Sequence, residues 1–231
     1  MSVALCCTHG FKPDTPQLRE EPSPTALAAR ETGTHTHDMI ALDLGVETPK
    51  RENVDPSHVA AAIALYKSAM NWIEPRRERV LSAEVGMRYD AATDRAVVGP
   101  RRGEPGYQDV EAMILPGTLD LVLRGADGVL EVVDVKTGKK AYETPWQLYA
   151  QAVAASRLYA EKIVRVGYLY PRKTKCDEPE WETLDEDRLD EEAGRISKVL
   201  RRLPMAEPER GDWCFRCDAR AACPKWQIDA A

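Results

Sequence analysis

The chain has 231 residues, of which 43% are hydrophobic and 30% are charged, and its formal net charge at pH 7 is -6. This composition predicts one domain, residues 1–231, with a single sizeable core. The acidic balance argues against the broad basic surface of a protein that coats nucleic acid non-specifically, and the apolar runs are much shorter than the roughly 20 residues needed to span a membrane. We therefore expect a cytoplasmic protein without a membrane segment.

The first half of the chain predicts two helices and then a strand. Residues 25–44 form the first helix, and a second helix has Asp55 as its N-cap, Pro56 at its first position and a stop at Pro75. Residues 79–87 follow as a strand. Residues 90–109 are polar and contain glycine and proline, so a hairpin or a loop is expected there.

The second half begins with a β-hairpin. Residues 117–138 contain two alternating apolar strands joined by a tight turn at residues 126–128, and this is the strongest hairpin signal in the chain. A helix is expected from Thr144 to Lys162, then a strand over 162–172 and an amphipathic helix over 184–203. Acids at the start of this last helix and basic residues at its end suit the helix dipole, so the acidic stretch 177–192 is interpreted as a solvated helix face rather than a second metal site.

The hairpin carries the residues of greatest chemical interest. On the strand "EVVDVK", Asp134 and Lys136 are two positions apart and project from one face. Such a pair alone is most often a surface ion pair worth under about 1 kcal/mol. However, the hairpin also places Asp120 opposite Asp134, and two converging carboxylates with a lysine suit Mg²⁺ or Mn²⁺. A metal held there would activate water and neutralise charge on a phosphodiester, with the lysine orienting the water.

The segment "GTLDLVL" followed by "EVVDVKTGKK" resembles the core of the PD-(D/E)XK nuclease superfamily, and most of all its RecB/AddB branch of CRISPR-associated and phage RecB-like exonucleases. The resemblance covers the chain from about residue 25 to the C-terminus. It implies an α/β, restriction-endonuclease-like fold with a mixed central sheet flanked by helices. It also implies that Asp120 and Asp134 are metal ligands, that Lys136 is the catalytic lysine, and that the backbone carbonyl of Val135 completes the coordination.

The same branch carries a helix with the pattern G-T-x-x-H, whose histidine joins the metal site, and "GTHTH" matches it with Gly33 and His37. His37 shares a helix face with small and apolar residues (Ala29, Gly33, Ile40, Ala41 and Leu44), whereas His35 lies on the nearly opposite face. A hydrogen-bonded core histidine is the simpler interpretation of His37 in isolation. Beside the two aspartates and the lysine we favour a metal ligand, which would shift the preference towards Mn²⁺.

RecB-like nucleases also carry a glutamine on the helix after the lysine, commonly with a tyrosine four residues later. Gln147 matches the glutamine, but position 151 is a second glutamine and Tyr149 lies on another helix face. Gln147 is therefore a candidate catalytic residue. It also stands where a capping box would place it if Thr144 were the N-cap, so both interpretations stay open. An acid on the strand containing Glu84 contributes to the site in some relatives, but we expect Glu84 to be a surface residue.

Cys214, Cys217 and Cys223 have the spacing C-x2-C-x5-C and cannot by themselves fill a site with four ligands. In the relatives that carry such a cluster, an upstream cysteine supplies the fourth ligand of a [4Fe-4S] cluster that clamps the C-terminus to the N-terminus. Cys6 and Cys7 are both candidates here. Zinc is the alternative, because the spacing suits both metals and His9 is close to the cysteine pair. Cys176 has no partner nearby in the sequence and is expected to be an ordinary thiol.

On this interpretation the single domain has three parts: an N-terminal segment 1–24 with a candidate cluster cysteine, a nuclease core 25–172, and a C-terminal helix and cysteine cluster 173–231. The expected function is a metal-dependent DNA nuclease, acting as an exonuclease on single-stranded DNA ends. The alternative is a non-catalytic DNA-binding or assembly subunit of a recombination or CRISPR-adaptation complex. A nuclease that works only inside such a complex is a third possibility, since an acidic chain would benefit from a protein partner that helps to hold DNA.

Overall fold

The structure is a computed structural model that describes residues 24–48, 55–101, 104–107, 113–138, 145–172 and 175–202. The expected clamp of the two chain ends lies outside these residues, because all of its candidate ligands do (Cys6, Cys7, Cys214, Cys217 and Cys223).

Within this part of the chain the helices are α2 (Pro24–Asp43), α3 (Pro56–Ile73), α4 (Trp146–Tyr159) and α5 (Glu186–Arg202), with a 3-10 helix, η2 (Glu74–Arg79), directly after α3. The strands are β1 (Val80–Asp90), β2 (Arg95–Val98), β3 (Ile114–Arg124), β4 (Leu130–Val135), β5 (Val164–Pro171), β6 (Cys176–Asp177) and β7 (Glu182–Leu184).

The start of α3 follows from its sequence. The Asp55 carboxylate accepts a hydrogen bond from the backbone N–H of Ser57 at 2.8 Å, and Pro56 occupies the first turn, where its missing N–H costs nothing. The predicted N-cap is therefore confirmed. The predicted end at Pro75 is close to the observed one, since the α-helix ends at Ile73 and Pro75 lies in the 3-10 turn that follows.

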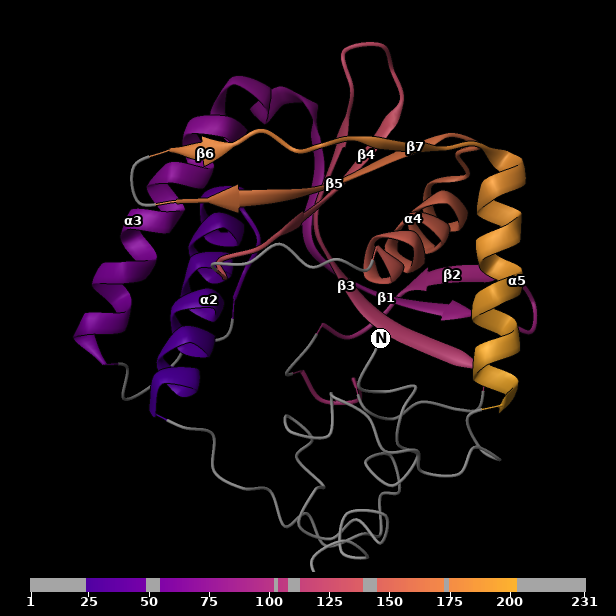
Figure 1. Cartoon of the computed structure of the whole chain (residues 1–231), viewed down its shortest axis with the longest axis horizontal. Helices are drawn as coiled ribbons and strands as arrows, with labels where there is room; N and C mark the ends of the chain where they lie inside the picture. Colours follow the sequence, from indigo (N-terminus) through magenta and orange to yellow (C-terminus); the bar gives the residue numbers. More distant parts are fainter. Residues whose placement is uncertain are drawn as a thin grey trace, which may run out of the picture.

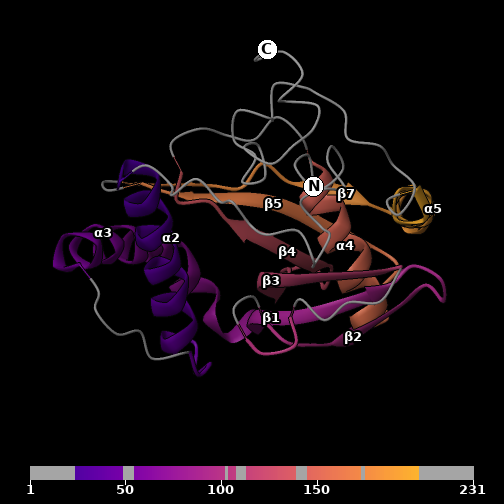
Figure 2. The same cartoon turned by 90° about the horizontal axis from the view of Figure 1, so that it is seen from below.

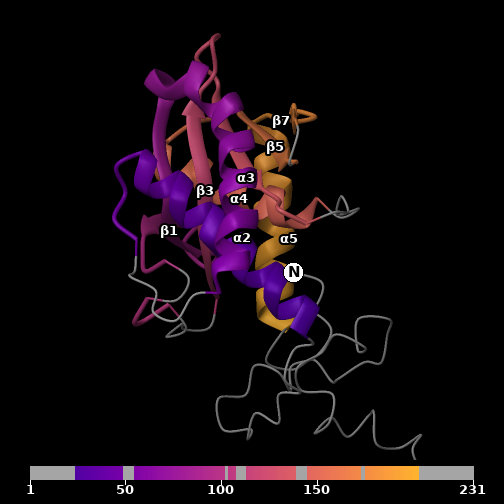
Figure 3. The ribbon, with the colours of Figure 1, turned by 90° about the vertical axis from the view of Figure 1, so that its left-hand side faces the viewer.

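The strands form a mixed sheet in the order β2-β1-β3-β4-β5-β6, with β7 also paired to β5. β1, β3 and β4 are antiparallel neighbours, whereas β4 and β5 are parallel and are connected through α4. In Figures 1 and 2 the strands lie between α2 and α3 on one side and α4 and α5 on the other. Figure 3 shows α2 and α3 in front of the strands.

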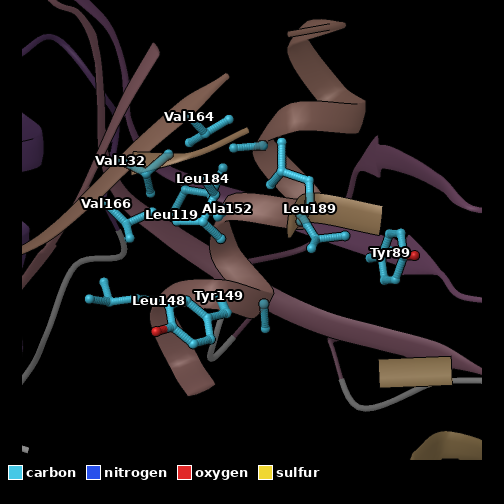
Figure 4. Close-up of a cluster of buried hydrophobic side chains, with 14 of the residues drawn as sticks. Tyr89, Leu119, Val132, Leu148, Tyr149, Ala152, Val164, Val166, Leu184 and Leu189 are labelled. Carbon is cyan, nitrogen blue, oxygen red and sulfur yellow. The ribbon is translucent and has the colours of Figure 1, made fainter. Parts of the chain in front are cut away.

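The sheet has a separate apolar core on each face. The α4-side core packs α4 and Leu189, Ala193 and Ile196 of α5 against the sheet, and it includes Val132 and Val166 (Figure 4). The α2/α3-side core packs Ile40 of α2 and Trp72 and Ile73 of α3 against the opposite face, where Val133 and Val135 lie. β4 is buried along its whole length, so Asp134 belongs to a central strand and not to the surface strand that a weak ion pair would occupy.

β1 and β3 change faces at one shared position. Leu119 belongs to the α4-side core and Leu121 to the α2/α3-side core, although residues two apart on a regular strand point to the same side. The same change occurs across the ladder between Ala83 and Val85, where Glu84 has a left-handed φ of 47°. A non-glycine residue adopts this conformation at a cost of about 1 kcal/mol or more. The strand pair therefore turns over at Glu84 and Asp120, which means that residues two apart across this point face opposite sides of the sheet.

The fold class predicted from the sequence, a mixed sheet flanked by helices, is confirmed. The region 90–109 contains the hairpin strand β2, whereas β6 and β7 were not predicted. The last helix begins at Glu186 rather than residue 184, because residues 182–184 pair with β5. Within the described ranges, none of the helices combines the length and the apolar character required to cross a membrane.

Candidate active site

Three side chains from three different elements meet where the strand pair turns over. His37 of α2 lies with Nδ1 2.7 Å from Glu84 Oε1 and 3.7 Å from Asp120 Oδ2. One ligand atom from each of these three residues falls within 4.8 Å of the others, which is close enough to hold one metal ion. The side chains are only 13–23% exposed. We call His37, Glu84 and Asp120 the acidic–histidine group.

The backbone of Val135 connects this group to the end of β4. His37 Nε2 lies 3.0 Å from the carbonyl oxygen of Val135, and the Val135 N–H donates to Asp120 Oδ2 at 2.8 Å. The carbonyl expected from the sequence as a further ligand therefore lies against the imidazole. An imidazole that donates to both Val135 and Glu84 must carry both ring protons, so this geometry is that of the imidazolium.

The pKa values of the group have a clear physical cause. Burial opposes charge on His37, but the carboxylates of Asp120 and Glu84 outweigh it and raise the pKa of the imidazole to about 10. Burial, reinforced by the neighbouring Asp134 and Glu84, raises the pKa of Asp120 to about 8. Protons are thus held where carboxylates converge, and a divalent cation would replace them. The residues present fit such an ion, since carboxylate and carbonyl oxygens suit Mg²⁺ and Mn²⁺, and the imidazole shifts the preference towards Mn²⁺.

Gly33 brings α2 close enough to the sheet for His37 to reach this position. A Cβ added at Gly33 would lie 2.8 Å from Oγ1 of Thr137, just after β4. This is closer than Cβ atoms approach in real structures, so the glycine of the "GTHTH" segment allows close contact between the helix and the strand end. His37 is one turn further along the same helix face.

A second group surrounds Asp134, which is completely buried. Lys136 Nζ lies 2.5 Å from Asp134 Oδ2, and Gln147 Nε2 donates to Oδ1 at 2.6 Å. The Gln147 carbonyl in turn accepts from Lys136 Nζ at 2.9 Å. Gln147 therefore holds the carboxylate and the ammonium in one arrangement. We call Asp134, Lys136, Gln147 and Gln151 the lysine group.

Gln151 is a member of this group that the sequence did not identify. It is 4% exposed, and its Nε2 donates to Asp134 Oδ1 at 3.0 Å and to the carbonyl oxygen of Thr118 at 3.2 Å. In the sequence Gln151 was notable only because it occupied a position where a tyrosine was expected. The sequence signal that could have identified Gln151 was its spacing from Gln147. Residues four apart on a helix share a face, and Gln147 was already a candidate.

A capping role for Gln147 depends on Thr144, which lies outside the described residues. α4 begins at Trp146, and its N-cap is Pro145 without a side-chain capping hydrogen bond. Tyr149 faces away from Asp134, as expected from its helix position, and its hydroxyl donates to Glu182 at 2.8 Å.

A known protein family matches the chain over most of its length. The model of the PD-(D/E)XK nuclease superfamily matches residues 11–224, which is most of the chain. The chain belongs to the PD-(D/E)XK nuclease superfamily. Membership implies a nuclease that uses divalent metal ions, and the acidic–histidine group offers such ions a site.

One solved structure similar to this superfamily member is described as "Crystal structure of SSO0001". It is 16% identical, with a TM-score of 0.43, and the similarity covers 84% of this chain and 96% of that one. No curated protein matches the chain.

The structure corrects the prediction for Glu84 and places the predicted metal ligands in two groups. Glu84 was expected at the surface, and this expectation is wrong, because the turnover of β1 directs its carboxylate onto His37. The predicted ligands His37, Asp120 and Val135 lie together, whereas Asp134 is engaged by Lys136 and two glutamines.

Glu84 also borders a cavity. A cavity of about 520 Å³ lies beside β1 and is lined in part by Ala83, Glu84 and Val85. Two arginines on its walls are already paired with acids, Arg77 with Asp43 and Glu74, and Arg101 with Glu104. The cavity thus borders Glu84, and its two arginines are neutralised by these acids.

Proposed function

We propose that this PD-(D/E)XK nuclease is a Mg²⁺- or Mn²⁺-dependent deoxyribonuclease that acts as an exonuclease on single-stranded DNA ends. The observation that carries the proposal is that the acidic–histidine group and the Asp134–Lys136 pair meet at the end of β4. There the backbone of Val135, the residue between Asp134 and Lys136, contacts both His37 and Asp120. A divalent metal bound there would supply an activated water and would neutralise charge on the phosphodiester.

In this proposal His37, Glu84, Asp120 and the Val135 carbonyl hold the metal, and Asp134 completes the ligand set. The ammonium of Lys136 stabilises negative charge that develops on the phosphate and orients the attacking water. Gln147 is the neighbour that keeps Lys136 in place, because it is hydrogen-bonded to the ammonium and to Asp134 at once. Gln151 keeps Asp134 oriented from the buried side.

The preference for single-stranded DNA ends rests on the resemblance of the motifs to RecB-like exonucleases. The alternative, a DNA-binding or assembly subunit without activity, is less well supported, because the chain retains Asp120, Asp134 and Lys136. A protein partner in a recombination or CRISPR-adaptation complex is compatible with a net charge of -6, which gives DNA little general attraction.

The test is cleavage of end-labelled single-stranded and duplex DNA by the purified protein with Mn²⁺, with Mg²⁺ and with EDTA. We expect the single strand to be shortened from its end only when metal is present. Internal cuts in a circular single strand would contradict the exonuclease assignment. Failure to cut any DNA or RNA with either metal would favour the non-catalytic alternative.

We also propose that Cys214, Cys217 and Cys223, with Cys6 or Cys7, bind a [4Fe-4S] cluster. Its support is the cysteine spacing, since all five cysteines lie outside the described residues. Anaerobically purified protein should be brown and contain iron, because thiolate-to-iron charge transfer colours the cluster, whereas a zinc site is colourless. Zinc without iron would overturn this proposal. Cys6→Ala and Cys7→Ala, compared singly, would show which residue is the ligand.

A further inference from the structure

Two tyrosines of β5 lie beside the lysine group. β4 and β5 are parallel, with Asp134 paired with Tyr168 and Val135 with Leu169. The N–H of Lys136 continues the ladder by donating to the carbonyl oxygen of Leu169 at 2.8 Å. Tyr170 is two residues beyond Tyr168, so both rings project from the same face of β5. Both residues are partly exposed.

The two tyrosine rings lie next to each other, with a cationic group at each end of the pair. Lys136 Nζ lies 5.5 Å from the centre of the Tyr168 ring, the two tyrosine ring centres are 6.0 Å apart, and the Arg172 guanidinium lies 5.0 Å from the centre of the Tyr170 ring. Arg172 also donates to the carbonyl oxygen of Gly138 at 2.5 Å and lies 3.7 Å from Asp177, which fixes its position. We call Tyr168, Tyr170 and Arg172 the tyrosine track.

The track differs from the apolar cores on either side of the sheet. Tyr168 borders the α4-side core, and Leu169, which lies between the two tyrosines in the sequence, is buried in the opposite core. The Tyr170 hydroxyl is buried and has no hydrogen-bond partner among the described residues. A tyrosine selected only for packing would avoid this cost by being phenylalanine. Packing among the described residues therefore does not account for the hydroxyl of Tyr170.

We infer that the tyrosine track binds single-stranded DNA next to the scissile phosphate, with bases stacked on the Tyr168 and Tyr170 rings and a backbone phosphate on Arg172. Two adjacent aromatic rings with a cation at each end suit a strand whose bases are unpaired, because every base has a face that can stack and the phosphates can contact the cations. The bases of a duplex are stacked on each other and cannot use the rings.

This inference rests on the proposed function and deepens it, since it assigns the preference for a single strand to named residues. Lys136 lies beside the Tyr168 end of the track, so a strand that follows the track passes directly to the lysine group. Arg172, one residue beyond the end of β5 and four residues after Tyr168, marks the other end.

The experiment measures binding by fluorescence anisotropy, with EDTA present so that the DNA stays intact, and it uses a labelled 12-nucleotide single strand and the matching duplex. Tyr168→Leu and Tyr170→Leu remove the rings, and Tyr170→Phe is the matched control that keeps the ring and loses only the unpartnered hydroxyl. Arg201→Gln, on the exposed end of α5, controls for the charge lost in Arg172→Gln. Thermal unfolding of each variant verifies that it is folded.

We expect each leucine variant to weaken single-strand binding about 5- to 30-fold, as loss of one stacked base does, while Tyr170→Phe and Arg201→Gln bind like the natural protein. Arg172→Gln should weaken binding and reduce its salt dependence. In cleavage assays with Mn²⁺ the leucine variants should raise KM more than they lower kcat.

The inference is wrong if Tyr170→Leu binds the single strand as tightly as Tyr170→Phe does, or if single strand and duplex are weakened equally. Because binding is measured without cleavage, this result is independent of whether the protein proves to be a nuclease. Normal cleavage of DNA by variants with unchanged KM would overturn the tyrosine track and leave the proposed function intact.

Discussion

The two halves of the candidate active site balance their charge in different ways. In the lysine group the buried carboxylate of Asp134 has its own cation, Lys136, and two glutamine amides as donors. In the acidic–histidine group two carboxylates share a single imidazole, whose pKa is raised to about 10. The first group carries its own permanent cation. The second is balanced only by protons and is the half that a metal ion would complete.

This difference teaches which residues should respond to metal. A buried carboxylate needs a compensating charge, and where the chain supplies none that is permanent, a divalent cation gains the most by binding. Substitutions in the acidic–histidine group should therefore alter metal affinity. Substitutions of Lys136, Gln147 or Gln151 in the lysine group should alter catalysis at a metal that is still bound.

The largest expected effect is the loss of cleavage in either half. Asp120→Asn and Lys136→Met should each reduce cleavage of single-stranded DNA by about 10³-fold, because the first removes a carboxylate that would hold the metal and the second removes the cation that stabilises charge developing on the phosphate. The assay is single-turnover cleavage with saturating Mn²⁺. Asp38→Asn, on the same helix as His37, is the control and should cleave normally. Undiminished cleavage by Lys136→Met would remove the lysine from the mechanism.

The acidic–histidine group should also make metal binding strongly dependent on pH. With the pKa of His37 at about 10 and that of Asp120 at about 8, the metal-free group holds protons at neutral pH, and a bound cation must displace them. Affinity for Mn²⁺ should therefore rise with pH between 6 and 8, by about tenfold per unit for each proton released. Calorimetry in two buffers that differ in their enthalpy of ionisation gives the number of protons released on binding. An affinity independent of pH would contradict this account.

A substitution of Gln151 tests the lysine group without removing any of its charges. Gln151→Leu leaves Asp134 Oδ1 with one amide donor instead of two, and we expect kcat to fall about 10- to 100-fold with little change in KM, as when a hydrogen bond that orients a catalytic group is lost. Gln151→Asn keeps the amide but shortens the side chain, so it tests whether the amide must reach Asp134. A change in thermal stability without any change in kcat would show that Gln151 is only a structural residue.

The hairpin residues could be predicted from sequence, and two residues that lie beside them could not. Asp120, Asp134 and Lys136 follow from strand alternation and hairpin register, which are local. The direction of Glu84 depends on the turnover of β1, and a left-handed glutamate in a strand has no sequence signal. Gln151 acts through contacts with β3 and β4 that lie 33 and 17 positions away. Likewise β6 and β7 are short, and they exist because β5 offers them an edge.

The smallest expected effect concerns the approach of α2. Gly33→Ala places a methyl group against Thr137 and should displace His37 slightly, which weakens Mn²⁺ binding several-fold. Gly194→Ala is the matched control, because open space surrounds that position in α5, and it should raise stability by about 0.5–1 kcal/mol through helix propensity alone. The double variant Gly33→Ala, Thr137→Ala removes the clash and should restore metal binding. If it does not, contact with Thr137 is not what positions His37.

Equilibrium binding of Mn²⁺ at pH 8 to the natural protein, Asp120→Asn and Lys136→Met tests the central claim most directly, because it separates the two halves of the site without requiring catalysis. We predict that Asp120→Asn weakens binding by at least about 30-fold, whereas Lys136→Met binds Mn²⁺ as tightly as the natural protein or more tightly, since it loses a nearby positive charge. Unchanged binding by Asp120→Asn, or an equal loss in both variants, would contradict the assignment of the metal to the acidic–histidine group.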